Sequence, residues 1–160
     1  MEQQIGREQL MHLLPHKGKM FLLSRVDSYD IKTHSISFEY DITKDCIFYE
    51  QELGGIPNWV CFEIMAQGIS AISSIERAEN GTLDSSRPGV ILSINNFSCE
   101  KDFFKEDTTI FIKITEDYHT EEVFRYECFL YESKADENPC AKAIISVMEM
   151  KDMSCFYENN

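Results

Sequence analysis

The chain has few basic residues and no long apolar run. Fifteen Lys and Arg stand against twenty-eight Asp and Glu in 160 residues, which leaves a formal net charge of -13. Such a field repels nucleic acid and anionic membrane surfaces, so we expect neither as a partner. No stretch reaches about eighteen consecutive apolar residues, so no transmembrane helix is expected. The opening residues lack the pattern of a signal peptide, which predicts a cytoplasmic location.

The six cysteines are too far apart in sequence for a metal or redox motif. No CxxC pair occurs, and no histidine is placed to complete a zinc knuckle, so no metal site is expected. Without an export signal we expect reduced thiols and not a disulfide framework. The cysteines lie at positions 46, 61, 99, 128, 140 and 155, and the apolar runs around Cys61 and Cys128 predict core positions for these two.

The remaining composition is that of an ordinary folded protein. Apolar residues make up 43% and aromatic residues 12% of the chain, enough for a substantial core in a single domain spanning residues 1–160. The only long polar tract rich in Gly, Pro and Ser is 76–89, which predicts a loop.

The apolar spacing predicts one long helix and an antiparallel sheet. A short helix should end at Pro15, because the residue before a proline is pushed out of the helical region. Residues 57–78 carry apolar side chains at helical spacing and on other faces too, so this helix should be buried nearly all round, with Pro57 in its first turn. Strands are predicted at 20–26, 31–40, 90–95, 108–115, 123–131 and 141–150. The last four lack crossover helices, which favours an α+β fold, a sheet wrapped around the helix, over a parallel βαβ fold.

Glu63 stands out because it lies within the most apolar helix of the chain. An ionised carboxylate buried without a partner is costly, so we expect its proton affinity to rise. Gln67 follows one turn later and would share its face, where it can hold the carboxyl group by a hydrogen bond. The alternative is a Glu at the edge of the helix, pointing to solvent or paired with a base.

His16 follows the proline that ends the first helix. A histidine titrates near neutral pH and is the usual general base, but a histidine at a turn also serves to cap a helix or to pack at an edge. Both interpretations stay open for His16. We assign no role to the other histidines: His12 is expected on the amphipathic N-terminal helix, and His34 and His119 fall in polar strand or turn surroundings.

Two stretches, LLPHKGKMFLLSRV and IPNWVCFEIMAQ, together resemble the hotdog-fold 3-hydroxyacyl-acyl-carrier-protein dehydratases. In that family a PH-containing segment runs into the first strand, and an E-x-MAQ motif lies on the central helix. The nearest branch is the aryl-polyene-cluster dehydratase-like proteins, which pair with a second hotdog subunit or with themselves. The resemblance implies a hotdog fold, a homodimer or heterodimer, and no cofactor.

The resemblance carries some site residues over and leaves one position unmatched. Glu63 matches the helix carboxylate, Gln67 the glutamine of MAQ, and Asn58 the position whose backbone amide holds the thioester carbonyl. The family's catalytic histidine lies fourteen residues before the carboxylate, where this chain has Tyr49. Either His16 takes over as base, with Tyr49 lining the pocket, or this subunit has lost its base and serves as a partner.

The implied reaction is dehydration of a 3-hydroxyacyl thioester to an enoyl thioester, as in fatty-acid or polyketide synthesis. Glu63 would act as acid and His16 as base, in a tunnel lined by Ile56, Trp59 and Phe62. The acyl chain would arrive on the phosphopantetheine of an acidic acyl carrier protein, with Lys17 and Lys19 as candidate docking residues or, alternatively, as solvated lysines. An acyl thioesterase and a non-catalytic partner subunit are the alternatives, because hotdog folds host several functions.

Overall fold

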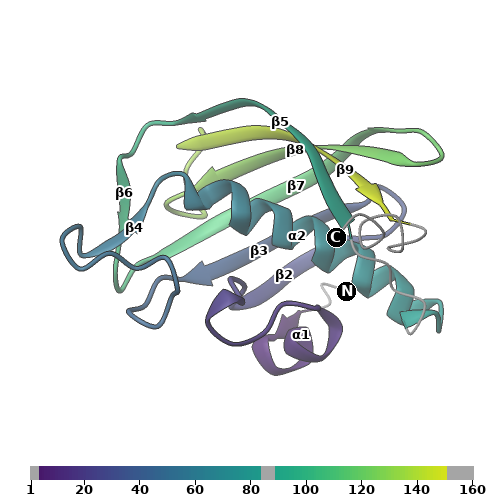
Figure 1. Cartoon of the computed structure of the whole chain (residues 1–160), viewed down its shortest axis with the longest axis horizontal. Coiled ribbons are helices and arrows are strands. Elements are labelled where there is room, and N and C mark those ends of the chain that lie inside the picture. The colour runs from purple at the N-terminus through teal and green to yellow at the C-terminus, as the bar shows by residue number, and fades with distance from the viewer. Residues whose placement is uncertain (1–3, 84–88, 151–160) are drawn as a thin grey trace, which may run out of the picture.

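The computed structural model describes residues 4–83 and 89–150, and in it one antiparallel sheet curves around one long helix. Figure 1 shows α2 lying lengthwise across one face of the sheet. The sheet order is β1-β2-β3-β7-β8-β9-β5, and β4 pairs with β6 in a separate two-stranded ribbon. The helices are α1 (Arg7–Leu13), a 3₁₀ turn (Gly18–Met20) and α2 (Val60–Glu79), and the strands are β1 (Ile5–Gly6), β2 (Arg25–Asp30), β3 (Ser35–Asp41), β4 (Gly55–Pro57), β5 (Gly89–Cys99), β6 (Phe103–Lys105), β7 (Thr109–His119), β8 (Val123–Tyr131) and β9 (Ala141–Glu149).

This architecture confirms the predicted sheet around a central helix. β7, β8 and β9 form the expected meander, and β8 has the predicted bounds. β5 does not stand next to β7, as a simple meander would require, but crosses to the far edge of the sheet and pairs with β9. None of the helices in the described ranges is long and apolar enough to span a membrane.

The start of α2 differs from the prediction. Pro57 is the last residue of β4, and the helix begins three residues later at Val60. The reason is tertiary, because β4 pairs with β6 in a register that sets Pro57 opposite Phe103. At its other end the helix continues to Glu79, into the tract predicted as a loop, whose residues 84–88 lie outside the described ranges.

The predicted strand at 20–26 is also wrong in its first part, because β2 begins only at Arg25. Phe21, Leu22 and Leu23 are all buried. Among the described residues, their backbone groups bond to side chains or, in the case of the Phe21 amide, to the Gly18 carbonyl at 3.2 Å, and not to a neighbouring strand. The Leu22 amide donates to Gln67 Oε1 at 2.8 Å, and Arg7 Nη1 donates to the Leu23 carbonyl at 2.7 Å. The segment is therefore fastened to α2 and α1.

Close packing between α2 and the sheet depends on one glycine. A Cβ atom at Gly68 would lie 2.2 Å from Cε1 of Phe38 and 2.7 Å from Cδ1 of Ile114. Both side chains are buried in β3 and β7, so neither has room to withdraw. Gly68 thus lets the helix backbone approach the sheet at its middle.

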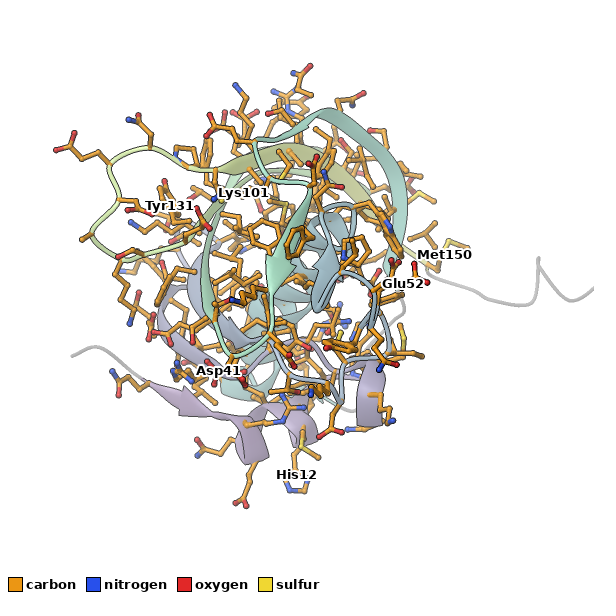
Figure 2. All side chains as sticks on the ribbon, turned by 90° about the vertical axis from the view of Figure 1, so that its left-hand side faces the viewer. His12, Asp41, Glu52, Lys101, Tyr131 and Met150 are labelled. Atoms are coloured by element: carbon orange, nitrogen blue, oxygen red, sulfur yellow. The ribbon has the colours of Figure 1, made fainter. Side chains whose placement is uncertain are left out.

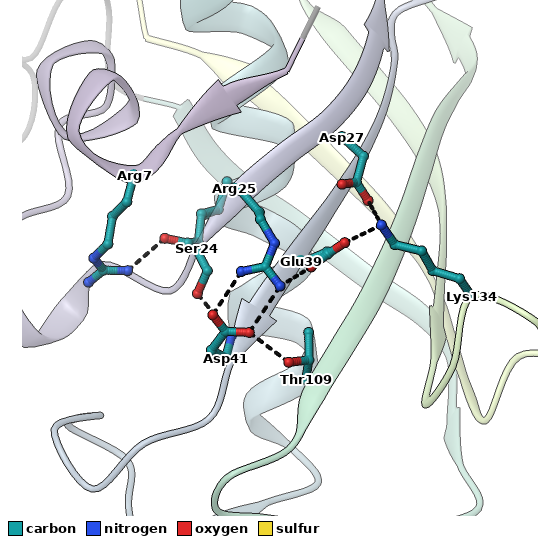
Figure 3. Close-up of polar contacts among 9 residues, drawn as sticks. Arg7, Ser24, Arg25, Asp27, Glu39, Asp41, Thr109 and Lys134 are labelled. Carbon is teal, nitrogen blue, oxygen red and sulfur yellow. Dashed lines mark hydrogen bonds and ion pairs between the residues drawn. The ribbon is translucent and has the colours of Figure 1, made fainter. Parts of the chain in front are cut away.

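The outer face of the sheet carries a network of charged groups, drawn in Figure 3. Phe38 and Tyr40 face the core, so the side chain of Glu39 between them points to the outer face, yet it is only 3% exposed. It forms ion pairs with Arg25 and Lys134. Arg25 also donates to both oxygens of Asp41, at 2.8 and 3.2 Å, and this contact lowers the pKa of Asp41. Lys134 precedes β9, so the network joins β2 and β3 to a distant loop.

Two of the cysteines occupy the core positions predicted for them. Cys61 on α2 and Cys128 on β8 are both completely buried. The five cysteines within the described ranges are free thiols, and Cys155 lies outside these ranges.

Candidate active site

A cavity of about 660 Å³ runs along one side of α2. Buried residues face the sheet, whereas a stripe of half-buried residues at spacings of three and four faces the cavity. The opposite wall comes from Pro15 and His16 and from β5, β8 and β9. The helix stripe that lines the cavity consists of Glu63, Ala66, Ser70, Ser73 and Arg77.

The structure brings Glu63 and His16 to this cavity from positions far apart in sequence. His16 lies between α1 and the 3₁₀ turn, where burial lowers its pKa from the ordinary 6.5 and the carboxylate of Glu63 opposes that shift. Its Nδ1 atom is buried and has no hydrogen-bond partner among the described residues. A neutral imidazole with a free nitrogen is able to accept a proton from a bound molecule.

Gln67 positions Glu63, as their spacing in the sequence predicts. Gln67 Nε2 lies 3.1 Å from Glu63 Oε1 and donates to it, and the same nitrogen donates to the Met20 carbonyl at 2.7 Å. Since Gln67 Oε1 accepts from the Leu22 amide, the fully buried Gln67 side chain is held at both ends. Glu63 itself is half-buried, because it belongs to the stripe that faces the cavity and not to the face packed on the sheet.

The predicted tunnel lining does not coincide with this cavity. Ile56 in β4 is completely buried, whereas Trp59 is 44% exposed. The Trp59 ring contacts Phe48 edge-on and lies tilted against Phe62 at the start of α2. Neither Ile56 nor these aromatic side chains lines the cavity of His16 and Glu63. An apolar residue beside the motif packs wherever the tertiary structure offers a partner, and the role of Ile56, Trp59 and Phe62 in lining a substrate tunnel stays a prediction.

Tyr49 and Asn58 also lie away from the cavity. Desolvation of the Tyr49 hydroxyl group, together with the nearby carboxylate of Glu106 and a hydrogen bond to it, raises the pKa of Tyr49. The Asn58 amide, expected to hold a thioester carbonyl, donates to the Asp102 carbonyl at 3.0 Å, and its side chain donates to the Lys101 carbonyl at 2.8 Å. The amide is therefore occupied in this structure by a contact that fastens the start of α2 to the segment after β5.

The two candidate docking lysines have different surroundings. Lys17 donates to the Leu14 carbonyl at 3.0 Å and to the Met11 carbonyl, so its ammonium group caps the end of α1. Lys19 is exposed in the middle of the 3₁₀ turn. Figure 2 shows His12 on the outer side of α1, directed away from the body of the molecule.

Sequence reasoning missed the polar residues at the far end of the cavity. His34 Nδ1 lies 2.6 Å from Glu116 Oε2, and its Nε2 lies 3.6 Å from Glu76 Oε2. Arg77 pairs there with Glu149, the last residue of β9. The stripe on α2 was visible in the sequence as small and polar residues at helical spacing, but nothing local indicated that His34 or Glu149 would meet it. Among the described residues, no group of three or more His, Cys, Asp or Glu side chains is arranged to hold a metal ion.

Comparison with solved structures supports the fold. The chain is similar to a chain of the dehydratase heterocomplex ApeI:P from Xenorhabdus doucetiae, with a TM-score of 0.80, 19% identity and coverage of 94% of this chain and 97% of that one. It also resembles the virulence protein Cj0977 from Campylobacter jejuni, with a TM-score of 0.64, 9% identity and coverage of 91% and 90%. A putative thioesterase from Ralstonia eutropha matches with a TM-score of 0.54, 14% identity and coverage of 77% and 82%.

At the level of sequence, no curated protein matches the chain. A family model described as ApeP dehydratase, in contrast, matches residues 8–158, nearly the whole length. This match agrees with the hotdog dehydratase resemblance carried by the LLPH and FEIMAQ segments. The chain therefore belongs to the ApeP-like dehydratase family.

Proposed function

We propose that the protein dehydrates 3-hydroxyacyl thioesters carried by an acyl carrier protein, with Glu63 as general acid and His16 as general base. The observation that supports this most directly is that both side chains line one cavity, although they are far apart in sequence. The Nδ1 atom of His16, which has no hydrogen-bond partner among the described residues, fits the role of base. The hydrogen bond from Gln67, which holds Glu63 in place, fits the role of acid. Apolar side chains such as Ile69, Ile72 and Val147 on the cavity wall suit an acyl chain.

In the proposed reaction His16 removes a proton from the carbon next to the thioester carbonyl. Glu63 gives a proton to the 3-hydroxyl group, which leaves as water while the double bond forms. The lowered pKa of His16 keeps the imidazole neutral at neutral pH, which is the form that the first step requires. The two groups end as imidazolium and carboxylate, and exchange with water restores them.

The substitution Glu63→Gln tests the acid role. The amide keeps the shape and the neighbouring hydrogen bond but cannot donate the carboxylic proton, so we expect turnover to fall by about 10²–10⁴-fold. The assay follows loss of water from a 3-hydroxyacyl carrier protein by mass spectrometry, with and without a second hotdog subunit. Glu52→Gln, the same change at an exposed turn residue, is the matched control. Full activity of Glu63→Gln would refute the assignment, and release of free thiol in place of an enoyl product would indicate a thioesterase.

A second candidate function is that of a partner subunit that supports a sister hotdog dehydratase. It is favoured by Tyr49, which occupies the position of the family's loop histidine and lies outside the cavity. The similar chain from Xenorhabdus doucetiae also belongs to a dehydratase heterocomplex. Activity of the mixture that survives Glu63→Gln and His16→Gln in this chain would favour this role.

The proposal includes a carrier protein and a cytoplasmic location. A carrier protein is acidic, so it must approach basic groups on a chain whose formal charge is -13. Lys19 is the better candidate, because its ammonium group is exposed while that of Lys17 caps α1. Lys19→Glu should raise KM for the carrier-bound substrate more than for a small thioester analogue.

A further inference from the structure

Three of the cysteines meet beside the first turn of α2, outside the cavity of the candidate active site. Cys61 lies in that turn, Cys99 is the last residue of β5, and Cys140 directly precedes β9. The two strand positions are neighbours, because Cys99 pairs with Ala141 and the Glu100 amide donates to the Cys140 carbonyl at 2.8 Å.

The start of α2, which carries Cys61, is hydrogen-bonded to the segment that follows Cys99. Asn58 donates from its backbone to Asp102 and from its side chain to Lys101, which holds the start of α2 against the residues that follow Cys99. As a result the Cys61 thiol forms a hydrogen bond with the sulfur of Cys99. Cys61 follows Asn58 by three residues and Cys99 precedes Asp102 by three, so both cysteines lie where the start of α2 meets the end of β5. Each belongs to a backbone segment that is fixed by other bonds.

The two thiols differ in exposure and acidity. Cys99 is half-buried, whereas Cys61 is completely buried. The hydrogen bond from Cys61 lowers the pKa of Cys99 to about 7, with help from a backbone hydrogen bond at Lys101 and against the effect of burial. The same hydrogen bond and, to a smaller extent, burial raise the pKa of Cys61. An accessible thiolate next to a second thiol is the arrangement found at redox-sensitive cysteines.

We propose that Cys99 and Cys61 form a peroxide-sensitive thiol pair that closes reversibly to a disulfide. The Cys99 thiolate attacks hydrogen peroxide, the O–O bond breaks, and the products are a sulfenic acid on Cys99 and hydroxide, which takes up a proton. The sulfur of Cys61 then attacks the sulfur of Cys99, the S–O bond breaks, and the departing hydroxide takes the proton of Cys61. In total two thiols and one peroxide give one disulfide and two water molecules.

The proposed bond would join the first turn of α2 to the end of β5. Cys61 precedes Glu63 by two residues, so oxidation would tie down the turn that leads into the candidate acid. The pair itself does not depend on the proposed dehydration, since it needs only the three contacting segments. Its test is therefore chemical and uses no substrate.

The experiment treats the full chain with hydrogen peroxide and maps its disulfides by mass spectrometry of unreduced peptides. We expect a disulfide that links the peptides of Cys61 and Cys99, a mass lower by two hydrogen atoms, and complete reversal by dithiothreitol. Cys99→Ser should abolish the bond, and Cys128→Ser, the matched change at a buried thiol outside the cluster, should leave it intact. In Cys61→Ala, dimedone should label a sulfenic acid at Cys99.

Two results would overturn the proposal. One is the absence of a Cys61–Cys99 bond after peroxide treatment that oxidises methionines in the same sample. The other is a disulfide that joins Cys99 to Cys140 in place of Cys61. If Cys61→Ala fails to fold, Cys99→Ser still decides the question, because Cys99 is only half-buried and its hydroxyl analogue fits the same space.

Discussion

The two candidate catalytic side chains are held by different kinds of contact. Glu63 is oriented by a hydrogen bond from Gln67, which is itself bonded to the segment at 20–22. His16 has no hydrogen bond at its buried Nδ1 within the described part of the chain, so burial governs its protonation. At the residue scale, the site therefore combines one carboxyl group that is held in place with one imidazole nitrogen that has no partner among the described residues.

Replacing Gln67 tests the positioning contact. Gln67→Leu leaves the Leu22 amide without a partner in a buried location, so we expect the free energy of unfolding to fall by about 1–3 kcal/mol. Turnover should fall as well, because Glu63 loses its hydrogen bond. Urea denaturation measures the stability, and Gln51→Leu at an exposed turn position is the control. Equal stabilities of the two variants would contradict this account.

His16 also predicts a pH dependence of stability. Its pKa in the folded state is lowered below 6.5, so the unfolded chain binds more protons in the interval between the two values. The associated stability is fully present above 6.5 and is lost as the pH falls through the folded value. In His16→Gln, the free energy of unfolding should therefore vary less with pH across this interval. His12→Gln, at an exposed helix position, should keep the wild-type slope.

At the scale of the elements, the site depends on how closely α2 lies against the sheet. Gly68 faces Phe38 and Ile114, and the next stripe around the helix, which contains Glu63, faces the cavity. Any displacement of the helix would move Glu63 relative to His16, which belongs to a different segment.

Gly68→Ala tests this packing. The added methyl group must displace two buried side chains, which costs about 1–3 kcal/mol, whereas alanine regains about 1 kcal/mol in helix propensity. We expect a net loss of up to about 2 kcal/mol in thermal or urea unfolding, with a larger loss for Gly68→Val. Gly89→Ala, where a Cβ atom meets nothing within 4 Å, should be nearly neutral. A higher free energy of unfolding for Gly68→Ala than for wild type would contradict this account, because it would mean that Phe38 and Ile114 move aside at little cost.

Comparing the predicted with the observed helices and strands shows which of them local sequence patterns can predict. α2 and β8 follow from apolar spacing, because their backbone hydrogen bonds repeat regularly and their side chains face a core. The segment at 20–24, with β4 and β6, was not predicted correctly because the bonding partners of these residues lie far along the chain. Leu22 bonds to Gln67, and Pro57 stands opposite Phe103. For the same reason, nothing in the local sequence indicated that the Asn58 amide donates to the Asp102 carbonyl.

At the scale of the whole molecule, β5 forms the far edge of the sheet within the described ranges and carries exposed apolar side chains. Its strand neighbour in this sheet is β9, and its exposed side chains include Ile91, Leu92 and Phe97. Two bulges interrupt this strand, one between Ile91 and Ser93. Exposed apolar side chains on an edge strand mark a surface suited to a second protein. The proposed hotdog partner would cover this edge.

Leu92→Lys tests the edge as the partner surface. Leu92 is 48% exposed, so a lysine there should leave the free energy of unfolding within about 0.5 kcal/mol of wild type. Binding to a second hotdog subunit, or to a second copy of this chain, should weaken because a charge enters an apolar contact. Size-exclusion chromatography with light scattering measures the assembly. Tyr118→Lys, an exposed position on β7, is the control. Unchanged assembly of Leu92→Lys would place the interface elsewhere.

The sequence by itself determined the class of fold, the central helix and the pairing of Glu63 with Gln67, because each depends on residues that are close in the chain. It also carried the motifs that led to the dehydratase family. Only the tertiary structure decided which side of α2 borders the cavity, that His16 faces it from another segment, and that Tyr49, Ile56 and Asn58 lie elsewhere. The thiol contact between Cys61 and Cys99 arose in the same way, since β5 reaches the start of the helix only after the chain has folded. Local periodicity determines which residues are buried, but which distant residues meet depends on how strands pair and how far each connection crosses.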